Sequence, residues 1–154
     1  MTGLETEFES ADQSPGLLLW QVTNRWQQAQ RATLKPYGLT HVQFVVLASL
    51  TYLAADGPVT QKALAGHAAL DPMMTSQVLR ALESAGLVVR EDHPTDRRAK
   101  ALTVTAEGRA VANRTVKAVE ACDAEFFAPL GNSRALMQAL TALRQPRLGH
   151  LGDP

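Results

Sequence analysis

The chain has 154 residues, of which 45% are hydrophobic and 19% are charged, an ordinary globular composition that allows a buried core. No apolar run approaches the roughly 18 residues that span a membrane, and residues 1–10 lack the basic start and apolar stretch of a signal peptide. The only cysteine, Cys122, cannot form an internal disulfide, so we expect a protein of the reducing cytoplasm with no membrane partner.

The formal net charge of zero hides an uneven distribution of charge along the chain. Residues 1–14 carry four carboxylates and no base, which leaves a charge of +4 on the rest of the chain. Residues 97–117 hold six bases against Glu107 alone. A local basic surface is typical of a protein with a polyanion partner, although a solvated helix face would carry the same charges. We expect residues 1–14 to form a flexible acidic tail and residues 147–154 a second flexible tail.

Helical signals fill the first half of the chain. Apolar residues at three- and four-residue steps predict a helix over 15–35, which Pro36 and Gly38 interrupt. Thr40 with Gln43 predicts a capping box at the start of a buried apolar helix that ends near 56–58. Thr60 then caps a short helix with Ala63 and Leu64 inward. After about four residues, Asp71 and Pro72 open another helix, which stops at Gly86.

The second half begins with strand signals. "LVVRE" and "AKALTVT" have strand character and flank the turn "DHPTD", which predicts an antiparallel β-hairpin. Thr105 caps a long helix that Pro129 closes, and a last helix over 131–145 ends at Pro146. The expected fold is mostly α-helical with a small hairpin: a short helix, a tight turn, a second helix and a wing form a winged helix-turn-helix.

The outward face of the helix after Asp71 suits contact with DNA. It carries short, amide-bearing or basic side chains and almost no carboxylate, and these can pair with base edges in a major groove. An ordinary amphipathic helix with a neutral face is the alternative for this helix taken alone. In the hairpin that follows, Arg97 or Arg98 can enter a minor groove, and Asp96 can orient one of them by a charge-assisted hydrogen bond. The candidate DNA contacts are Thr60, Gln61, Met73, Thr75, Ser76, Gln77, Arg80, Asp96, Arg97, Arg98 and Lys100.

Three stretches carry a resemblance to a known family. "DHPTDRRAKALTVTAEG", "LDPMMTSQVLRALESAGLVVRE" and "GLTHVQFVVL" resemble the wing, the recognition helix and the second helix of the multiple antibiotic resistance regulator (MarR) family. The resemblance implies a single domain over 15–146, with a winged helix-turn-helix at 40–105 and dimerisation helices at 15–35 and 106–145. It also implies a homodimeric transcriptional regulator, in the commoner mode a repressor, that binds a near-palindromic operator in double-stranded DNA.

The dimer and a ligand site have their own candidate residues. Apolar residues of the outer segments are candidates for burial by a second chain, although they can also pack within one chain: Trp20, Trp26, Phe126, Phe127, Leu130, Leu136 and Leu140. Family members often bind small phenols in a cleft, so the resemblance implies a possible aromatic or phenolic effector. The candidate ligand residues are Trp20, Trp26, Tyr37 and His41.

Other functional classes have little support in the sequence. There is no glycine-rich phosphate loop, nucleophile elbow or paired metal-ligand spacing, so we expect no enzyme, no cofactor and no metal. Cys122 lies beside Glu120 and Asp123, whose charges disfavour a thiolate, so we interpret it as a packed or surface cysteine. The rival function is a winged-helix protein-interaction module without sequence-specific DNA binding.

Overall fold

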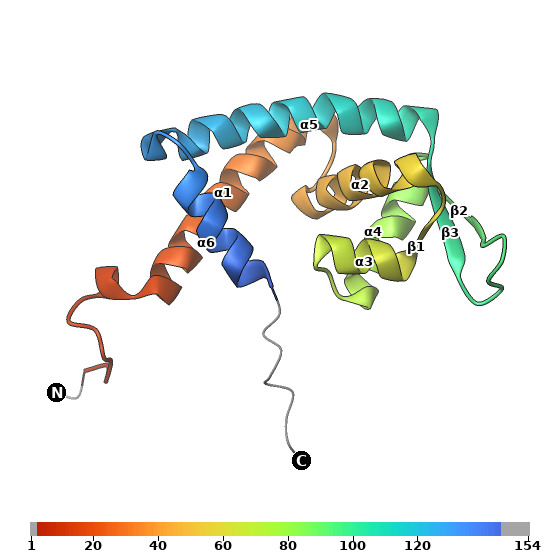
Figure 1. Cartoon of the computed structure of the whole chain (residues 1–154). Helices are drawn as coiled ribbons and strands as arrows, with labels where there is room; N and C mark the ends of the chain where they lie inside the picture. Colours follow the sequence, from red (N-terminus) through yellow and green to blue (C-terminus); the bar gives the residue numbers. More distant parts are fainter. Residues whose placement is uncertain (1–2, 146–154) are drawn as a thin grey trace, which may run out of the picture. The chain divides into compact units, whose positions relative to one another are not determined.

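The structure, a computed structural model, describes residues 3–145. Within that range the α-helices are α1 (Pro15–Leu34), α2 (His41–Leu53), α3 (Gln61–Ala68), α4 (Pro72–Ser84), α5 (Ala106–Phe127) and α6 (Arg134–Arg144). The strands are β1 (Val59–Thr60), β2 (Val88–Asp92) and β3 (Lys100–Val104). Figure 1 shows the predicted order of helices and hairpin along the chain, which confirms the expected fold class.

The chain divides into two compact units, residues 1–122 and residues 123–154, with the break inside α5. The first unit contains α1 to α4, the small sheet and most of α5. The described part of the second unit contains the end of α5 and all of α6. The boundaries proposed for a DNA-binding lobe and a dimerisation region stay predictions. The tail expected at 147–154 lies outside the described residues.

Side-chain caps fix where the helices begin. Thr40 and Gln43 form the predicted reciprocal capping box at the start of α2. The Thr60 hydroxyl accepts from the amide of Ala63, and the Asp71 carboxylate accepts from the amide of Met74 at 2.8 Å. Each bond satisfies an amide that has no partner within its own helix, so the polar residue in the sequence sets the start of the helix.

The main core of the first unit forms where α2, α3, α4 and β3 meet. Its fully buried members come from all four elements: Val46, Leu47, Leu50, Leu64, Leu79, Leu82 and Leu102. The predicted inward pair of α3 is half wrong, since Ala63 is exposed and the buried residues are Leu64 and Ala65. Burying a leucine side chain is worth about 2 kcal/mol, so this cluster holds the helix-turn-helix together.

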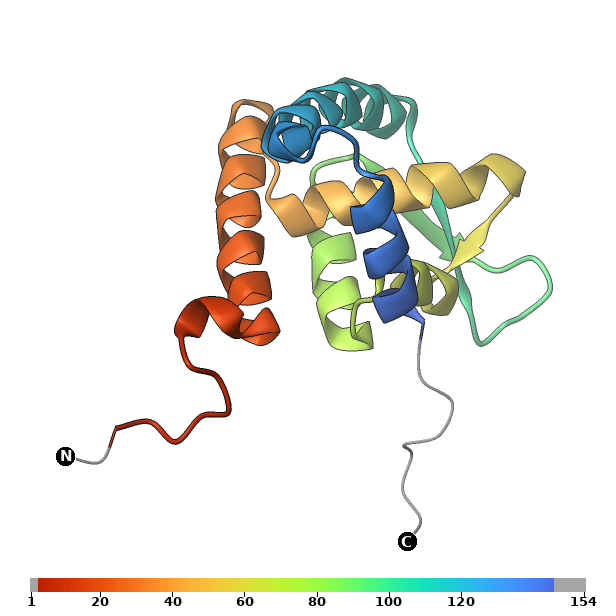
Figure 2. The ribbon, with the colours of Figure 1, turned by 60° about the vertical axis from the view of Figure 1, so that its left-hand side comes forward.

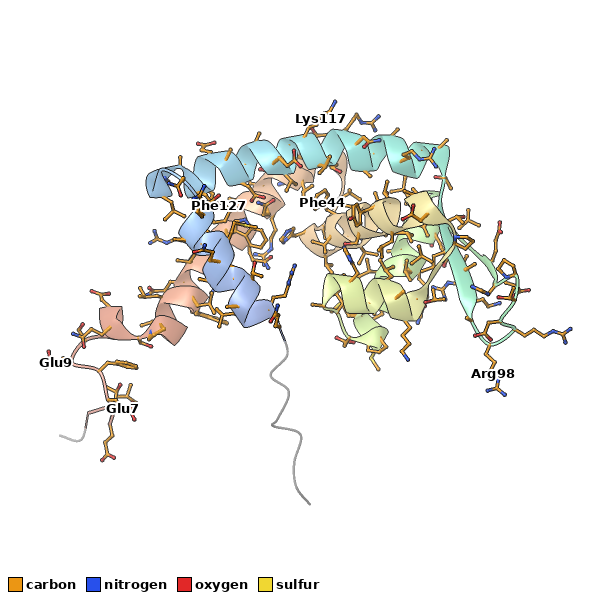
Figure 3. All side chains as sticks on the ribbon, in the orientation of Figure 1. Glu7, Glu9, Phe44, Arg98, Lys117 and Phe127 are labelled. Carbon is orange, nitrogen blue, oxygen red and sulfur yellow. The ribbon has the colours of Figure 1, made fainter. Side chains whose placement is uncertain are left out.

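A second, smaller cluster joins α5 to the helices beneath it. Leu34 of α1, Phe44 of α2 and Val119 of α5 pack together and are buried. Figure 3 shows α5 running above α2, with Phe44 labelled between them, and Figure 2 shows α5 crossing α1 near the C-terminal end of α1. The middle of α5 is thereby packed against the same scaffold that carries the helix-turn-helix.

The wing is an antiparallel sheet with strand order β1-β3-β2. In the hairpin Val88 pairs with Val104 and Asp92 with Lys100, which places the turn residues 93–99 at the far end. The two-residue strand β1, which the sequence did not predict, pairs Val59 with Leu102 and attaches the hairpin to the segment before α3. The wing therefore extends directly from the helix-turn-helix core (Figure 1).

Within residues 3–145 no single helix is long and apolar enough to cross a membrane. The two segments Pro15–Tyr37 and His41–Asp56 meet the length and composition test only when taken together, and they are bent by 75° at their junction.

Candidate nucleic-acid interface

Helices α3 and α4 meet in a tight turn that presents one face of α4 to solvent. The backbone of Ala69 closes α3 in the left-handed region, at φ 53°, and the amide of Leu70 donates to the carbonyl of Ala65. Asp71 then starts α4 directly, so the turn between the two helices contains only residues 69–71. The amide of Gln61 lies near the start of α4, where its nitrogen is 3.5 Å from the carbonyl oxygen of Pro72. Thr60 contributes its hydroxyl to the α3 cap.

The outward face of α4 has the composition expected for DNA contact. Met73, Gln77 and Arg80 are exposed, and Ser76 is half-buried and accepts a hydrogen bond from the Arg80 guanidinium at 3.2 Å. Thr75 is a correction to the prediction: its side chain is fully buried and its hydroxyl donates to the carbonyl of Asp71. Thr75 therefore belongs to the core side of α4, and its side chain is not available to DNA.

The loop of the wing is organised around a histidine that sequence reasoning did not single out. The His93 ring nitrogen Nδ1 accepts from the amides of Thr95 and Asp96 at 3.2 and 3.1 Å. The amide of His93 donates to the carbonyl of Ala99, which closes the loop across its base. These bonds fix the backbone conformation of the loop that carries the two arginines.

Asp96 positions the wing loop through the backbone and not through an arginine side chain. Its carboxylate accepts from the amide of Arg98 at 3.0 Å. Across residues 3–145, no ion pair joins Asp96 to Arg97 or Arg98, so the predicted charge-assisted bond to a guanidinium is wrong. Both arginines are exposed, and Figure 3 shows Arg98 pointing away from the helices at the end of the wing.

Lys100 forms an ion pair at the base of the wing loop. Its ammonium group contacts the carboxylate of Asp92, the residue directly across the hairpin, and both side chains are exposed. The hydrogen bond from Lys100 and its positive charge lower the pKa of Asp92 below its ordinary value. Lys100 is therefore held in place but partly neutralised, a feature that the strand register alone could have revealed.

A second ion pair links the wing to α4. The guanidinium Nε of Arg90 on β2 lies 3.4 Å from the carboxylate of Glu83, and both side chains are less than one-third exposed. This is an ion pair without hydrogen-bond geometry, and within the described residues the buried Nη2 of Arg90 has no hydrogen-bond partner. The contact joins the two elements that carry the candidate DNA contacts.

The candidate ligand residues are only partly brought together. His41 and Trp26 meet edge to face, with ring centroids 4.9 Å apart, and His41 Nδ1 is 2.9 Å from the Gln27 side-chain oxygen. Trp20 and Tyr37 are exposed. Beside His41 lies a hollow of about 440 Å³ lined by Arg31, Lys35, Gly38, Leu39, Thr40 and His41. The two cations in this lining were missed because nothing in their helical spacing distinguishes them from solvated surface residues.

Comparison with known proteins places this geometry in a family. Residues 39–100, which include the helix-turn-helix and most of the wing, match the sequence profile of the MarR family. The HTH-type transcriptional regulator YdcH of Bacillus subtilis is 38% identical over 139 residues, which cover 90% of this chain and 95% of YdcH. The chain belongs to the MarR family. Its MarR fold is that of a winged helix-turn-helix transcriptional regulator.

Two further family members have known structures or assigned roles. The HTH-type transcriptional repressor Rv2887 of Mycobacterium tuberculosis is 38% identical over 121 residues, covering 78% of this chain and 85% of Rv2887. Its crystal structure with p-aminosalicylic acid aligns with a TM-score of 0.65 at 34% identity, covering 86% of this chain and 99% of that one. CouR of Rhodococcus jostii RHA1, crystallised with p-coumaroyl-CoA, aligns with a TM-score of 0.76 at 25% identity, covering 95% of this chain and all of CouR.

Proposed function

We propose that this MarR-family protein is a sequence-specific regulator, acting as a repressor, that binds double-stranded operator DNA as a homodimer. The observation that carries the proposal is the exposed face of α4 beside a wing that presents Arg97 and Arg98. In this arrangement α4 lies in a major groove, where Gln77 and Arg80 read base edges. The wing reaches the neighbouring minor groove, whose potential attracts an arginine.

Exposed apolar faces on both terminal helices support the homodimer. On α1, Leu18, Leu19, Trp20 and Val22 are exposed. On α6 no residue is buried, and Met137, Leu140 and Leu143 are exposed on one helical face. An amphipathic helix without a buried residue has an apolar face that lacks a partner within its own unit, and a second copy is the partner that the family fold implies. Among the other candidates, Trp26, Phe126, Phe127 and Leu136 are half-buried, and Leu130 is exposed.

The hollow beside His41 supports an effector that carries a negative charge. Arg31 and Lys35 line it together with Thr40 and His41 at the start of α2, where the positive end of the helix dipole favours an anion. Rv2887 and CouR were each crystallised with an aromatic ligand that bears an acidic or acyl-CoA group. We therefore propose that a small aromatic acid binds near Trp26 and His41 and releases the protein from DNA. The protein then works as a regulator rather than an enzyme, in the cytoplasm where DNA is accessible.

Selection of bound sequences from random duplex DNA at two salt concentrations tests the proposal. A homodimer selects two related half-sites about one helical turn, roughly 34 Å, apart. Affinity falls with salt, the logarithm of the binding constant dropping by about 0.9 for each phosphate neutralised per unit of log salt. A protein-interaction module, the alternative, binds duplex DNA weakly at low salt and enriches no sequence. That result would refute the proposed function.

A further inference from the structure

The first turn of α4 exposes two consecutive methionines. The sequence has four methionines, and two of them, Met73 and Met74, occupy this turn. The Met73 side chain is 72% exposed and that of Met74 is 40% exposed. An exposed apolar side chain gains little from burial, so the Met73 thioether does not serve the packing of the first unit, and that of Met74 is only partly covered. They belong to the surface that the proposed function assigns to DNA.

Exposed thioethers can be oxidised by a hydroperoxide in solution, whereas buried thioethers are protected from it. A sulfur lone pair attacks the terminal oxygen of a hydroperoxide, an S–O bond forms and the O–O bond breaks. The sulfur is oxidised by two electrons to the sulfoxide, the proton on the transferred oxygen passes to the departing oxygen, and the hydroperoxide is thereby reduced to an alcohol or to water. We propose that Met73 and Met74 form an oxidation site through which a hydroperoxide switches off DNA binding, an inference that rests on the proposed function.

The sulfoxide opposes DNA binding by its polarity. An unmodified Met73 presents a soft apolar end that can contact a thymine methyl group. The sulfoxide replaces it with a strong dipole whose oxygen is a hydrogen-bond acceptor with partial negative charge. Facing DNA, that oxygen is desolvated without a donor and is repelled by phosphates. Because DNA covers the same thioethers, oxidation acts on the free protein and holds it in the free state.

The modification leaves the fold in place. Met73 lies on the exposed face of α4, and the helix start depends on the Met74 amide, which donates to the Asp71 carboxylate without involving the sulfur. Met137 is 58% exposed in the single chain and lies on α6, on the face assigned above to a second copy, so Met137→Leu separates oxidation at the dimer face from oxidation on α4. The other oxidisable group among the described residues is the half-buried thiol of Cys122, which a Cys122→Ser background removes.

The experiment compares four full-length proteins on the Cys122→Ser background: the parent, Met73→Leu/Met74→Leu, Met73→Leu and Met137→Leu. Each is treated with hydrogen peroxide, and sulfoxides are assigned by peptide mass spectrometry. Affinity for the selected operator is measured by fluorescence anisotropy before and after oxidation, together with the melting temperature. A second arm measures the rate of Met73 oxidation with operator present, and a third treats the oxidised protein with methionine sulfoxide reductases.

We expect oxidation to weaken operator binding by the parent and by Met137→Leu about ten-fold, with the melting temperature unchanged. The double variant keeps its affinity after the same treatment, reductase restores the parent, and operator slows the oxidation of Met73. Equal loss in the double variant, or a Met73 sulfoxide that binds like the thioether, overturns the inference while leaving the proposed function intact. Failure of every unoxidised protein to bind duplex DNA overturns both.

Discussion

Gly108, in the first turn of α5, lies against the carbonyl of Leu87 at the end of the turn after α4. A Cβ added to Gly108 would lie 2.0 Å from the Leu87 oxygen, far inside van der Waals contact. The same junction includes Thr105, whose hydroxyl donates to the carbonyl of Gly86 and accepts from the amide of Gly108. The start of α5 and the turn after α4 are therefore in direct backbone contact. This contact fixes the point where β3 leads into α5.

Gly108→Ala should destabilise the protein strongly. Because the clashing atom is backbone oxygen, the start of α5 must shift, at a cost of about 2–3 kcal/mol in the free energy of unfolding. Gly66→Ala on α3 is the matched control: nothing lies within 4 Å of its added Cβ. A glycine-to-alanine change in an open helical position gains about 0.5–1 kcal/mol. Urea denaturation measures both, and equal effects of the two substitutions would contradict the close approach.

The sequence predicted elements wherever the signal was local. Helix starts at Thr40, Asp71 and Thr105 follow from a polar side chain and its own next three residues, and the structure confirms all three. The sequence did not predict β1 because two residues carry no periodicity, and because β1 pairs with residues of β3 that are far away in the chain, Val59 with Leu102 and Thr60 with Ala101.

The candidate site was predictable in its residue types but less so in its contacts. Exposed Gln77 and Arg80 follow from a helical wheel. The hydrogen-bond partner of Asp96 does not follow from the sequence, because a backbone amide two residues away competes with two flexible guanidinium groups. The loop frame around His93 and the ion pair between Glu83 and Arg90 are products of tertiary packing, and no local pattern encodes them.

Ala69→Gly should stabilise the protein. Ala69 has a φ of 53°, and it is the only non-glycine residue with positive φ in the described range. A left-handed conformation costs a residue with a Cβ roughly 1 kcal/mol, a cost that glycine avoids, so the expected gain is about 0.5–1 kcal/mol. The control is Ala63→Gly on the exposed side of α3, where the helical backbone favours alanine and a loss of about 1 kcal/mol is expected. A higher melting temperature for Ala69→Gly together with a lower one for Ala63→Gly would confirm the backbone strain at Ala69. A lower melting temperature for both variants would refute it.

The ion pair between Glu83 and Arg90 should couple the wing to α4. In a double-mutant cycle with Glu83→Gln and Arg90→Met, we expect a coupling of about 0.5–1 kcal/mol in unfolding, modest because both groups are partly solvated. Operator affinity should fall in each single variant although neither residue lies among the candidate DNA contacts. The exposed pair Asp92 and Lys100 is the control, and its coupling in unfolding should be the smaller of the two because both side chains are exposed. The reverse ranking of the two cycles would show that the wing is not held by Arg90.

Asp92 should titrate below an ordinary aspartate and should restrain DNA binding. Lys100 lowers the pKa of Asp92, so the pair contributes stability above the unfolded-state pKa and loses it as the pH falls through the folded-state pKa. NMR titration should show this low pKa, and Lys100→Met should return it toward the ordinary value. Asp92→Asn frees the Lys100 ammonium for a phosphate, so operator affinity should rise and the salt slope should steepen by about one. Glu120→Gln on α5 is the control. An equal gain in operator affinity there would show that the effect of Asp92→Asn comes from the change in net charge.

Asp96 gives the sharpest test of how the wing is built, because two substitutions separate its charge from its hydrogen bond. The side-chain oxygen of Asp96 accepts from the amide of Arg98 and so fixes the backbone that carries this arginine. Asp96→Asn keeps an oxygen acceptor and removes the negative charge, so operator affinity should be unchanged or higher, since a carboxylate near phosphates is unfavourable. Asp96→Ala removes the acceptor as well, and affinity should fall about three- to ten-fold, the equivalent of a hydrogen bond worth roughly 1 kcal/mol. Anisotropy titration of both variants measures the difference, with Arg98→Ala defining the full loss of that side chain. If Asp96→Asn and Asp96→Ala weaken binding equally, Asp96 acts through its charge on an arginine side chain. The hydrogen bond from the Arg98 amide to Asp96 then does not orient the wing.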